Sequence, residues 1–277
     1  MDPFAYDQSK PLDVQTVALG RRGPVDLEGL TYRGTSGQRV SALFARPRQA
    51  VGCLMYQGFL GSTKEEAAPI WTGAAKLNLA TFTIDVPGLM DAPAIEAVLN
   101  NADSVRRVLT DTVIDLRRAL DYLETRPECR HNVGFLGSSL GAILGALLTG
   151  DDARVRTAVL TSIGGTWRGA LARGDGLVLP GIAARAAQFD AAVKTLQPLD
   201  AARWVARIAP RPVMLVNGLE DPLTPVRLAL VLDAAARQPK VVLHYKGGHN
   251  PFAGAQGRQV ARQVAAFFTR TLGARAS

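Results

Sequence analysis

The chain has 277 residues, 47% of them hydrophobic, and a formal net charge of +8, which fits one large domain with a complete core. No apolar run reaches about 18 residues, so we expect no segment that crosses a membrane. The arginines occur in scattered pairs, such as Arg21-Arg22 and Arg106-Arg107, rather than in one dense run, which argues against a nucleic-acid-binding surface.

The N-terminal segment, residues 1–24, carries no recognisable pattern, and we expect an extension ahead of the first strand. It has neither the basic start nor the apolar stretch of a secretory signal, which favours a cytoplasmic protein. The chain has two cysteines, Cys53 in a predicted strand and Cys129 in a predicted turn. In a reducing compartment both are expected to be free thiols.

Strands and helices are expected to alternate after an initial hairpin. The expected strands cover residues 25–34, 40–46, 51–56, 80–85, 132–136, 155–162, 211–217 and 240–245. The expected helices cover residues 67–78, 103–125, 140–150 and 258–272. This order predicts an α/β fold with a mostly parallel central sheet, an N-terminal antiparallel hairpin and helices on both faces.

One connection in this pattern is unusually long. Residues from about 163 to 205 separate two predicted strands, which is more than a simple connection needs. We expect this stretch to form a small helical cap, inserted in a single domain that covers residues 1–277.

The most informative motif is Gly137-Ser138-Ser139-Leu140-Gly141, a G-x-S-x-G sequence between a predicted strand and a predicted helix. This context is typical of a nucleophile elbow, a sharp turn that holds the central side chain, here Ser139, in the open. The glycines let the strand and the helix approach closely, and the helix N-terminus stabilises a developing oxyanion. The alternative interpretation is an ordinary Gly/Ser turn.

A serine hydroxyl needs a base to become a nucleophile, and the chain has three histidines. His131 begins the strand that leads to the elbow, so it lies at the wrong end of that strand. His244 lies inside a predicted strand, where a structural role is expected. His249 lies in a loop just beyond the last predicted strand, and we predict that it is the base.

The base in turn needs an orienting acid. Asp221 lies in the turn after the predicted strand 211–217 and is our prediction, with Glu220 as the competitor. The alternative is that Asp221 only forms an Asp-Pro turn. The order Ser139, Asp221, His249 matches that of α/β-hydrolases. All three residues follow predicted strands, whose carboxyl ends share one edge of a parallel sheet.

An oxyanion hole needs two backbone donors. One is the N–H of Leu140, which follows the predicted nucleophile. The other is expected from the loop at residues 57–62, where we predict the N–H of Phe59, with Leu60 as the alternative. The other interpretation of this loop is a simple Gly-rich connection.

Three stretches carry a family resemblance. Gln57-Gly58-Phe59-Leu60-Gly61-Ser62-Thr63-Lys64-Glu65-Glu66 is similar to a His-Gly-Phe-x-Gly-Ser-x-x-Glu pattern, and the elbow and the segments around Asp221 and His249 add to it. Over residues 25 to 273 the chain thus resembles α/β-hydrolases of the dienelactone hydrolase and acetyl xylan esterase-like carboxylesterase branch. The resemblance implies the α/β-hydrolase fold and a Ser-His-Asp triad. Gln57 replaces the usual histidine, which braces the oxyanion loop, so its amide either takes over this function or alters the loop.

These predictions combine into a serine esterase that cleaves esters of small or medium acyl groups through an acyl-enzyme. No metal or organic cofactor is needed for this chemistry. The candidate substrate contacts are Trp167, Leu89 and Met90. Other apolar residues of the expected cap line an acyl pocket or form buried helix faces, and these are Leu171, Leu177, Val178, Leu179 and Phe189.

Two alternatives stay open. One is an acyl thioesterase, which the basic charge would suit, or an aminopeptidase-like hydrolase. The other, in a different class, is a non-catalytic binding protein with the same fold. The expected partner is a small-molecule ester. Assembly into a homodimer is left open.

Overall fold

A computed structural model describes residues 2–34, 36–172 and 186–273. Its strands are β1 (Gln15–Arg22), β2 (Val25–Arg33), β3 (Arg39–Pro47), β4 (Gly52–Gln57), β5 (Leu79–Ile84), β6 (Val133–Ser138), β7 (Val155–Thr161), β8 (Val213–Gly218) and β9 (Lys240–Tyr245). They form one nine-stranded sheet in the order β1-β2-β3-β5-β4-β6-β7-β8-β9. The pairs β1-β2, β2-β3 and β3-β5 are antiparallel, and all the other pairs are parallel. The predicted fold class is confirmed.

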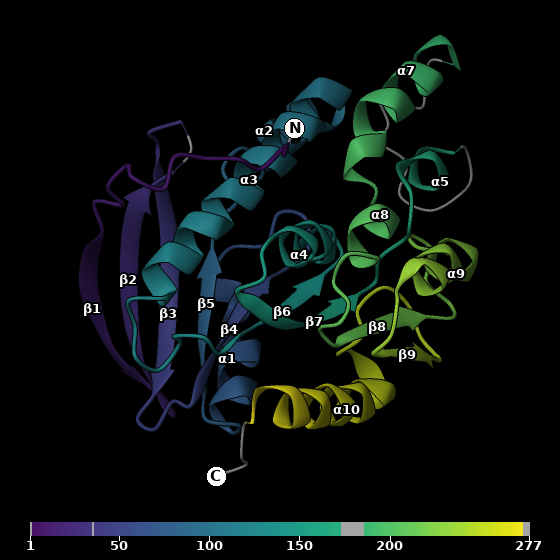
Figure 1. Cartoon of the computed structure of the whole chain (residues 1–277). Helices are drawn as coiled ribbons and strands as arrows, with labels where there is room; N and C mark the ends of the chain where they lie inside the picture. The colour runs from purple at the N-terminus through teal and green to yellow at the C-terminus, as the bar shows by residue number, and fades with distance from the viewer. Residues whose placement is uncertain (1, 35, 173–185, 274–277) are drawn as a thin grey trace.

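Helices cover both faces of this sheet (Figure 1). They are α1 (Ala68–Ala75), α2 (Ala92–Leu99), α3 (Ala102–Leu123), α4 (Leu140–Asp151), α5 (Trp167–Leu171), α7 (Ala186–Leu196), α8 (Ala201–Val205), α9 (Val226–Ala235) and α10 (Gly254–Leu272), with 3-10 turns at Glu65–Ala67 and Gln197–Leu199. The helices α1 and α10 pack on one face, α3 and α4 pack on the other, and α8 packs against α4. No helix within the described residues is both long and apolar enough to cross a membrane.

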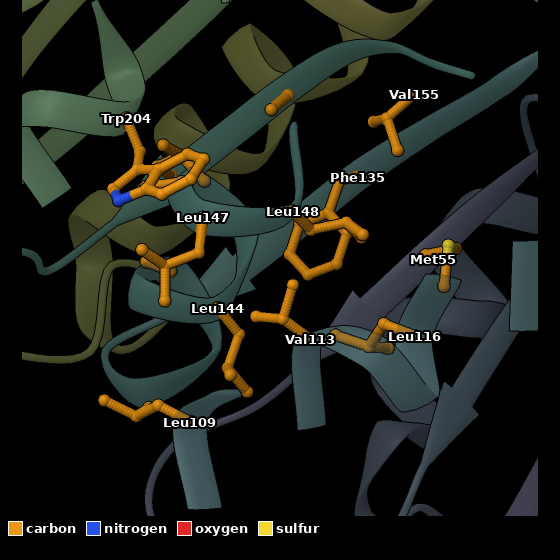
Figure 2. Close-up of a cluster of buried hydrophobic side chains, with 14 of the residues drawn as sticks. Met55, Leu109, Val113, Leu116, Phe135, Leu144, Leu147, Leu148, Val155 and Trp204 are labelled. Atoms are coloured by element: carbon orange, nitrogen blue, oxygen red, sulfur yellow. The ribbon is translucent and has the colours of Figure 1, made fainter. Parts of the chain in front are cut away.

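The central strands are apolar because they are buried on both faces. Every residue of β4, β5, β6 and β8 is buried, as expected for strands between two helix layers. Figure 2 shows the larger core on the α3/α4 face, where Phe135 of β6 lies among Leu144, Leu147 and Leu148 of α4. This packing fixes α4 against β6 and thereby sets the turn between them.

Some elements have too weak a sequence pattern to be predicted. Strand β1 is exposed along its whole length, so no buried face leaves an alternating apolar signal. The short helices α2 and α9 were not predicted either. The N-terminal segment is anchored at Phe4, which is buried with its ring 4.9 Å from that of Trp204 in α8.

The prediction of two free thiols is wrong, because Cys53 and Cys129 form a disulfide with their Cα atoms 4.9 Å apart. Cys53 lies in β4 and Cys129 lies in the turn after α3. The turn is tied to the strand because the N–H of Cys53 donates to the carbonyl of Asn132 at 2.9 Å. Sequence spacing held no information on this proximity, since the cysteines are 76 residues apart.

We predict that the disulfide contributes measurably to stability. Replacing both cysteines with alanine should lower the free energy of unfolding by about 2–4 kcal/mol, because the bond restricts a long loop of the unfolded chain. Urea unfolding of the double variant, compared with the oxidised wild type, measures this difference. Equal midpoints for both proteins would contradict the prediction.

Candidate functional site

The turn between β6 and α4 has the geometry of a nucleophile elbow. Ser139 has φ of 55° and ψ of −112°, a left-handed φ that few non-glycine residues adopt. Its backbone is held on both sides, since Ser139 N–H donates to Thr161 O and Ala142 N–H donates to Ser139 O, both at 2.9 Å. The side chain is partly exposed at the N-terminus of α4.

Glycine is required on both sides of Ser139 by close backbone contacts. A Cβ atom at Gly137 would lie 2.3 Å from the carbonyl oxygen of Gly141, and one at Gly141 would lie 2.0 Å from the carbonyl oxygen of Gln57. The N–H of Gly141 also donates to Gly58 O at 2.9 Å. The elbow and the loop after β4 are therefore in direct backbone contact.

We predict that Gly141→Ala is destabilising by at least about 1–3 kcal/mol, because the new methyl group meets backbone atoms that cannot move aside. The matched control is Gly73→Ala in α1, where a Cβ atom would meet nothing within 4 Å. That change should be neutral or stabilise by up to about 1 kcal/mol. Urea unfolding compares the two, and equal effects would contradict the close contact at Gly141.

Three of the predicted site residues form a chain in which His249 lies within hydrogen-bond distance of both Ser139 and Asp221. His249 Nε2 is 2.9 Å from Ser139 Oγ, and His249 Nδ1 is 2.7 Å from Asp221 Oδ2. The side chain of Asp221 is fully buried, whereas 18% of the His249 side chain is exposed. The three residues follow β6, β8 and β9, whose carboxyl ends meet at one edge of the sheet.

The surroundings of Asp221 favour its charged form. Burial alone would raise the pKa of this carboxyl group, but the hydrogen bond with His249 and the bonds from two backbone N–H groups outweigh it and lower the pKa. These N–H groups belong to Thr224 and Leu223, at 2.9 and 2.8 Å from Oδ1. Asp221 is therefore a carboxylate that holds the Nδ1–H of His249.

Two further residues hold the loop that carries His249. The hydroxyl of Ser162, just after β7, donates to the carbonyl of His249 at 2.5 Å, and the hydroxyl of Tyr245 donates to the carbonyl of Gly248. Ser162 has an unusual φ of 58°. Neither residue was predicted, although the position of Ser162 at the end of a central parallel strand was an available signal.

The other candidate base and acid residues lie elsewhere. The His131 side chain is 75% exposed and lies 3.3 Å from Glu124, at the opposite end of β6 from Ser139. His244 lies in β9 and pairs at 2.9 Å with Asp233 of α9. Glu220, the competitor of Asp221, is exposed. Neither His131, His244 nor Glu220 is hydrogen-bonded to Ser139 within the described residues.

The loop after β4 borders the same site. Phe59 and Leu140 both line a cavity with Ser139, and the Phe59 ring lies 5.7 Å from that of His249. Leu140 is the first residue of α4, so its N–H has no acceptor within the helix. Gln57 is buried, and its amide nitrogen has no hydrogen-bond partner among the described residues. The loop is joined to the elbow by the backbone bond from the Gly141 N–H to Gly58 O.

Two cavities meet at Ser139 and His249. The first, here called the compact chamber, has about 60 Å³ and is lined further by Ser162, Ile163, Gly164, Thr166, Ala170, Leu199, Ala201, Thr224 and Leu228. The second, the apolar chamber, has about 220 Å³ and is lined further by Phe59, Leu60, Leu89, Val98, Leu99, Val105, Val108, Leu109 and Leu140. Ile143, Trp167 and Leu223 border both.

The predicted substrate contacts are thus placed differently. Trp167 borders both chambers and Leu89 lines the apolar one, whereas Met90 lines neither. Leu171 is buried in the core, and Phe189 packs against that core. Leu177, Val178 and Leu179 lie outside the described residues.

The fold and this arrangement define an α/β-hydrolase-fold protein. A family model described as TAP-like protein matches residues 190–272, the segment that carries Asp221 and His249. No curated protein matches the chain significantly. Solved structures resemble it over nearly the whole length, at low sequence identity.

Three of these structures show the range of structural similarity. An acetyl xylan esterase from Paenibacillus sp. R4 has a TM-score of 0.77 and 18% identity, over 95% of this chain and 90% of that one. Acetyl xylan esterase 1 from Thermoanaerobacterium sp. JW/SL YS485 has a TM-score of 0.71 and 14% identity, over 94% and 88%. An acylaminoacyl peptidase from Pyrococcus horikoshii has a TM-score of 0.68 and 15% identity, over 91% and 42%. At such identities the likeness concerns the fold.

Proposed function

We propose that the protein is a serine esterase, with Ser139 as nucleophile, His249 as base and Asp221 as the orienting acid. The observation that carries this proposal is the continuous chain of hydrogen bonds from Asp221 through His249 to Ser139, beside two cavities. A serine held by a base that is itself held by a carboxylate is the arrangement that activates a hydroxyl group.

In the proposed reaction, His249 Nε2 takes the proton of Ser139 Oγ as this oxygen attacks the ester carbonyl carbon. The backbone N–H groups of Leu140 and Phe59, or Leu60 in place of Phe59, stabilise the oxyanion. His249 then gives its proton to the leaving alkoxide, and the acyl group stays on Ser139. Water attacks this acyl-enzyme by the same route, which releases the acid and restores the hydroxyl group.

The lining of the chambers favours an uncharged ester over the other hydrolase substrates. His249 is the only titratable side chain among the described residues that line either chamber. An aminoacyl amide would leave its ammonium group without a carboxylate, and the phosphates of a coenzyme A thioester would find no cation there. We therefore rank small or medium acyl esters above both alternatives.

A covalent probe and a substrate panel test the proposal. A fluorophosphonate should label wild-type protein at Ser139 and leave Ser139→Ala unlabelled, because phosphonylation needs the activated hydroxyl group. Absence of labelling in the wild type would support the non-catalytic alternative. In a panel of ethyl esters, acyl thioesters and aminoacyl amides, the esters should have the highest kcat/KM.

We also propose that residues 1–277 form one domain, with a cap at about residues 163–205. Within this stretch, Trp167 and Ala170 of α5, together with Leu199 and Ala201, border the compact chamber. A cytoplasmic location stays a prediction, and the disulfide does not support it, since disulfides persist mainly in oxidising environments. A homodimer also stays a prediction, which analytical ultracentrifugation can test.

A further inference from the structure

The two chambers at Ser139 accept groups of different size. The compact chamber has about 60 Å³ and the apolar chamber about 220 Å³. A cavity of about 150 Å³ holds a benzene molecule. The compact chamber is less than half that volume and fits only a group smaller than a benzene ring, whereas the apolar chamber fits a group somewhat larger than a six-carbon ring.

Trp167 is the largest side chain that borders both chambers, and it is held in place. Its indole N–H donates to the carbonyl of Leu199 at 3.1 Å, and its backbone N–H donates to the Asp200 carboxylate at 2.7 Å. Only 7% of the residue is exposed. Swinging the ring aside would break a buried hydrogen bond, so the indole is a fixed part of the border of both chambers.

The positions of the donors and the base assign the two halves of an ester. The oxyanion faces the N–H groups of Phe59 and Leu140, which line the apolar chamber. The leaving oxygen must face His249, the residue that protonates it. His249 borders both chambers, whereas the oxyanion donors Phe59 and Leu140 border only the apolar one. The alcohol thus leaves through the compact chamber, and the acyl chain extends away from it into the apolar chamber.

We propose that Trp167 is a specificity-determining residue that confines the alcohol half of the substrate to the compact chamber. The substrate class that follows is esters of short alcohols with apolar acids of about six to eight carbons. This inference rests on the proposed ester hydrolysis, with Ser139 as the nucleophile.

Two ester series test the assignment. In alkyl hexanoates, wild-type kcat/KM should fall at least about tenfold between ethyl and hexyl esters, since even one misplaced methylene group produces such discrimination. In ethyl esters of acids from acetate to dodecanoate, kcat/KM should peak at six to eight carbons, the size inferred from the apolar chamber. Trp167→Ala should abolish most of the discrimination against hexyl alcohol.

Control variants separate this effect from general damage. Trp204→Phe is the control for a buried indole, because Trp204 is also buried and its indole N–H donates to Pro198 O at 2.9 Å, but it borders neither chamber. If Trp167→Ala does not fold, Leu223→Ala opens the same boundary from a side chain that is 41% exposed, with the exposed Leu230→Ala as its control. Trp204→Phe and Leu230→Ala should keep the wild-type ratio of ethyl to hexyl hexanoate.

Two results would overturn the inference. One is a wild type that prefers long alcohols with acetate, and the other is an unchanged ethyl-to-hexyl ratio in folded Trp167→Ala or Leu223→Ala. Fluorophosphonate labelling of the same samples distinguishes these failures from a failure of the proposed function. Labelling requires the nucleophile and its base, but it depends little on which alkyl or acyl chain of a substrate fits either chamber.

Discussion

Replacing Ser139 with alanine should lower kcat for ethyl hexanoate by at least about 10⁴-fold, while the protein stays folded. The reason is that the proposed mechanism has no other nucleophile at the position that His249 can deprotonate. Release of acid, followed at constant pH, measures the rate. The urea midpoint should not fall, because the Ser139 side chain is partly exposed and its removal leaves no fully buried polar group without a partner.

The neighbouring residue provides a control in the same turn. Ser138 is buried, and its hydroxyl oxygen accepts a hydrogen bond from Thr161 at 3.0 Å rather than contacting His249. Ser138→Ala should therefore retain most of the activity and lose some stability, about 1 kcal/mol. Equal loss of activity in both variants, or wild-type activity in Ser139→Ala, would remove Ser139 from the proposed role.

Replacing Asp221 with asparagine should lower kcat by about 10⁴-fold, the size of effect seen when the acid of such a triad becomes an amide. The amide can donate a hydrogen bond to Nδ1, which favours the tautomer with the proton on Nε2, and that tautomer cannot accept the Ser139 proton. It also removes the charge that stabilises the His249 cation. Turnover of ethyl hexanoate by the purified variant, checked for folding by circular dichroism, measures this effect.

The chain contains a matched control for this change. Asp233 and His244 form a second carboxylate–imidazole pair at 2.9 Å, away from both chambers. Burial raises the pKa of Asp233, whereas the net effect at Asp221 is to lower it. Asp233→Asn should leave kcat within about threefold of wild type, because the Asp233–His244 pair links α9 to β9 and contacts no part of the proposed site. A similar loss in both variants would indicate structural damage rather than loss of an orienting acid.

Much of the fold could be predicted because buried strands and amphipathic helices leave strong periodic patterns. The strands β4 to β8 and the helix α3 are of this kind, and they appear near the expected positions. The exposed strand β1 leaves no such pattern, since no face of it is buried. The disulfide was missed for a different reason, because a compartment inferred from the lack of a secretory signal says nothing about the distance between Cys53 and Cys129.

The candidate site shows the same division. Ser139, Asp221 and His249 could be selected because a glycine-flanked turn and two loops after predicted strands each have local signals. Ser162 and Tyr245 hold the His249 loop through hydroxyl groups, and these contacts depend on the tertiary structure, although Ser162 lies at the end of a central parallel strand. The roles of the three selected residues in catalysis stay predictions until the variants above are measured.

By itself, the sequence determined the α/β architecture and the residue types available for acyl transfer, because secondary structure depends on local periodicity and turn chemistry. The tertiary structure decided which groups meet. It joined Cys53 to Cys129, left the Gln57 amide nitrogen without a hydrogen-bond partner among the described residues and placed Trp167 at the border of two chambers of unequal size. Such distances arise from the packing of helices and loops on the sheet, and side chains far apart in the chain determine that packing together.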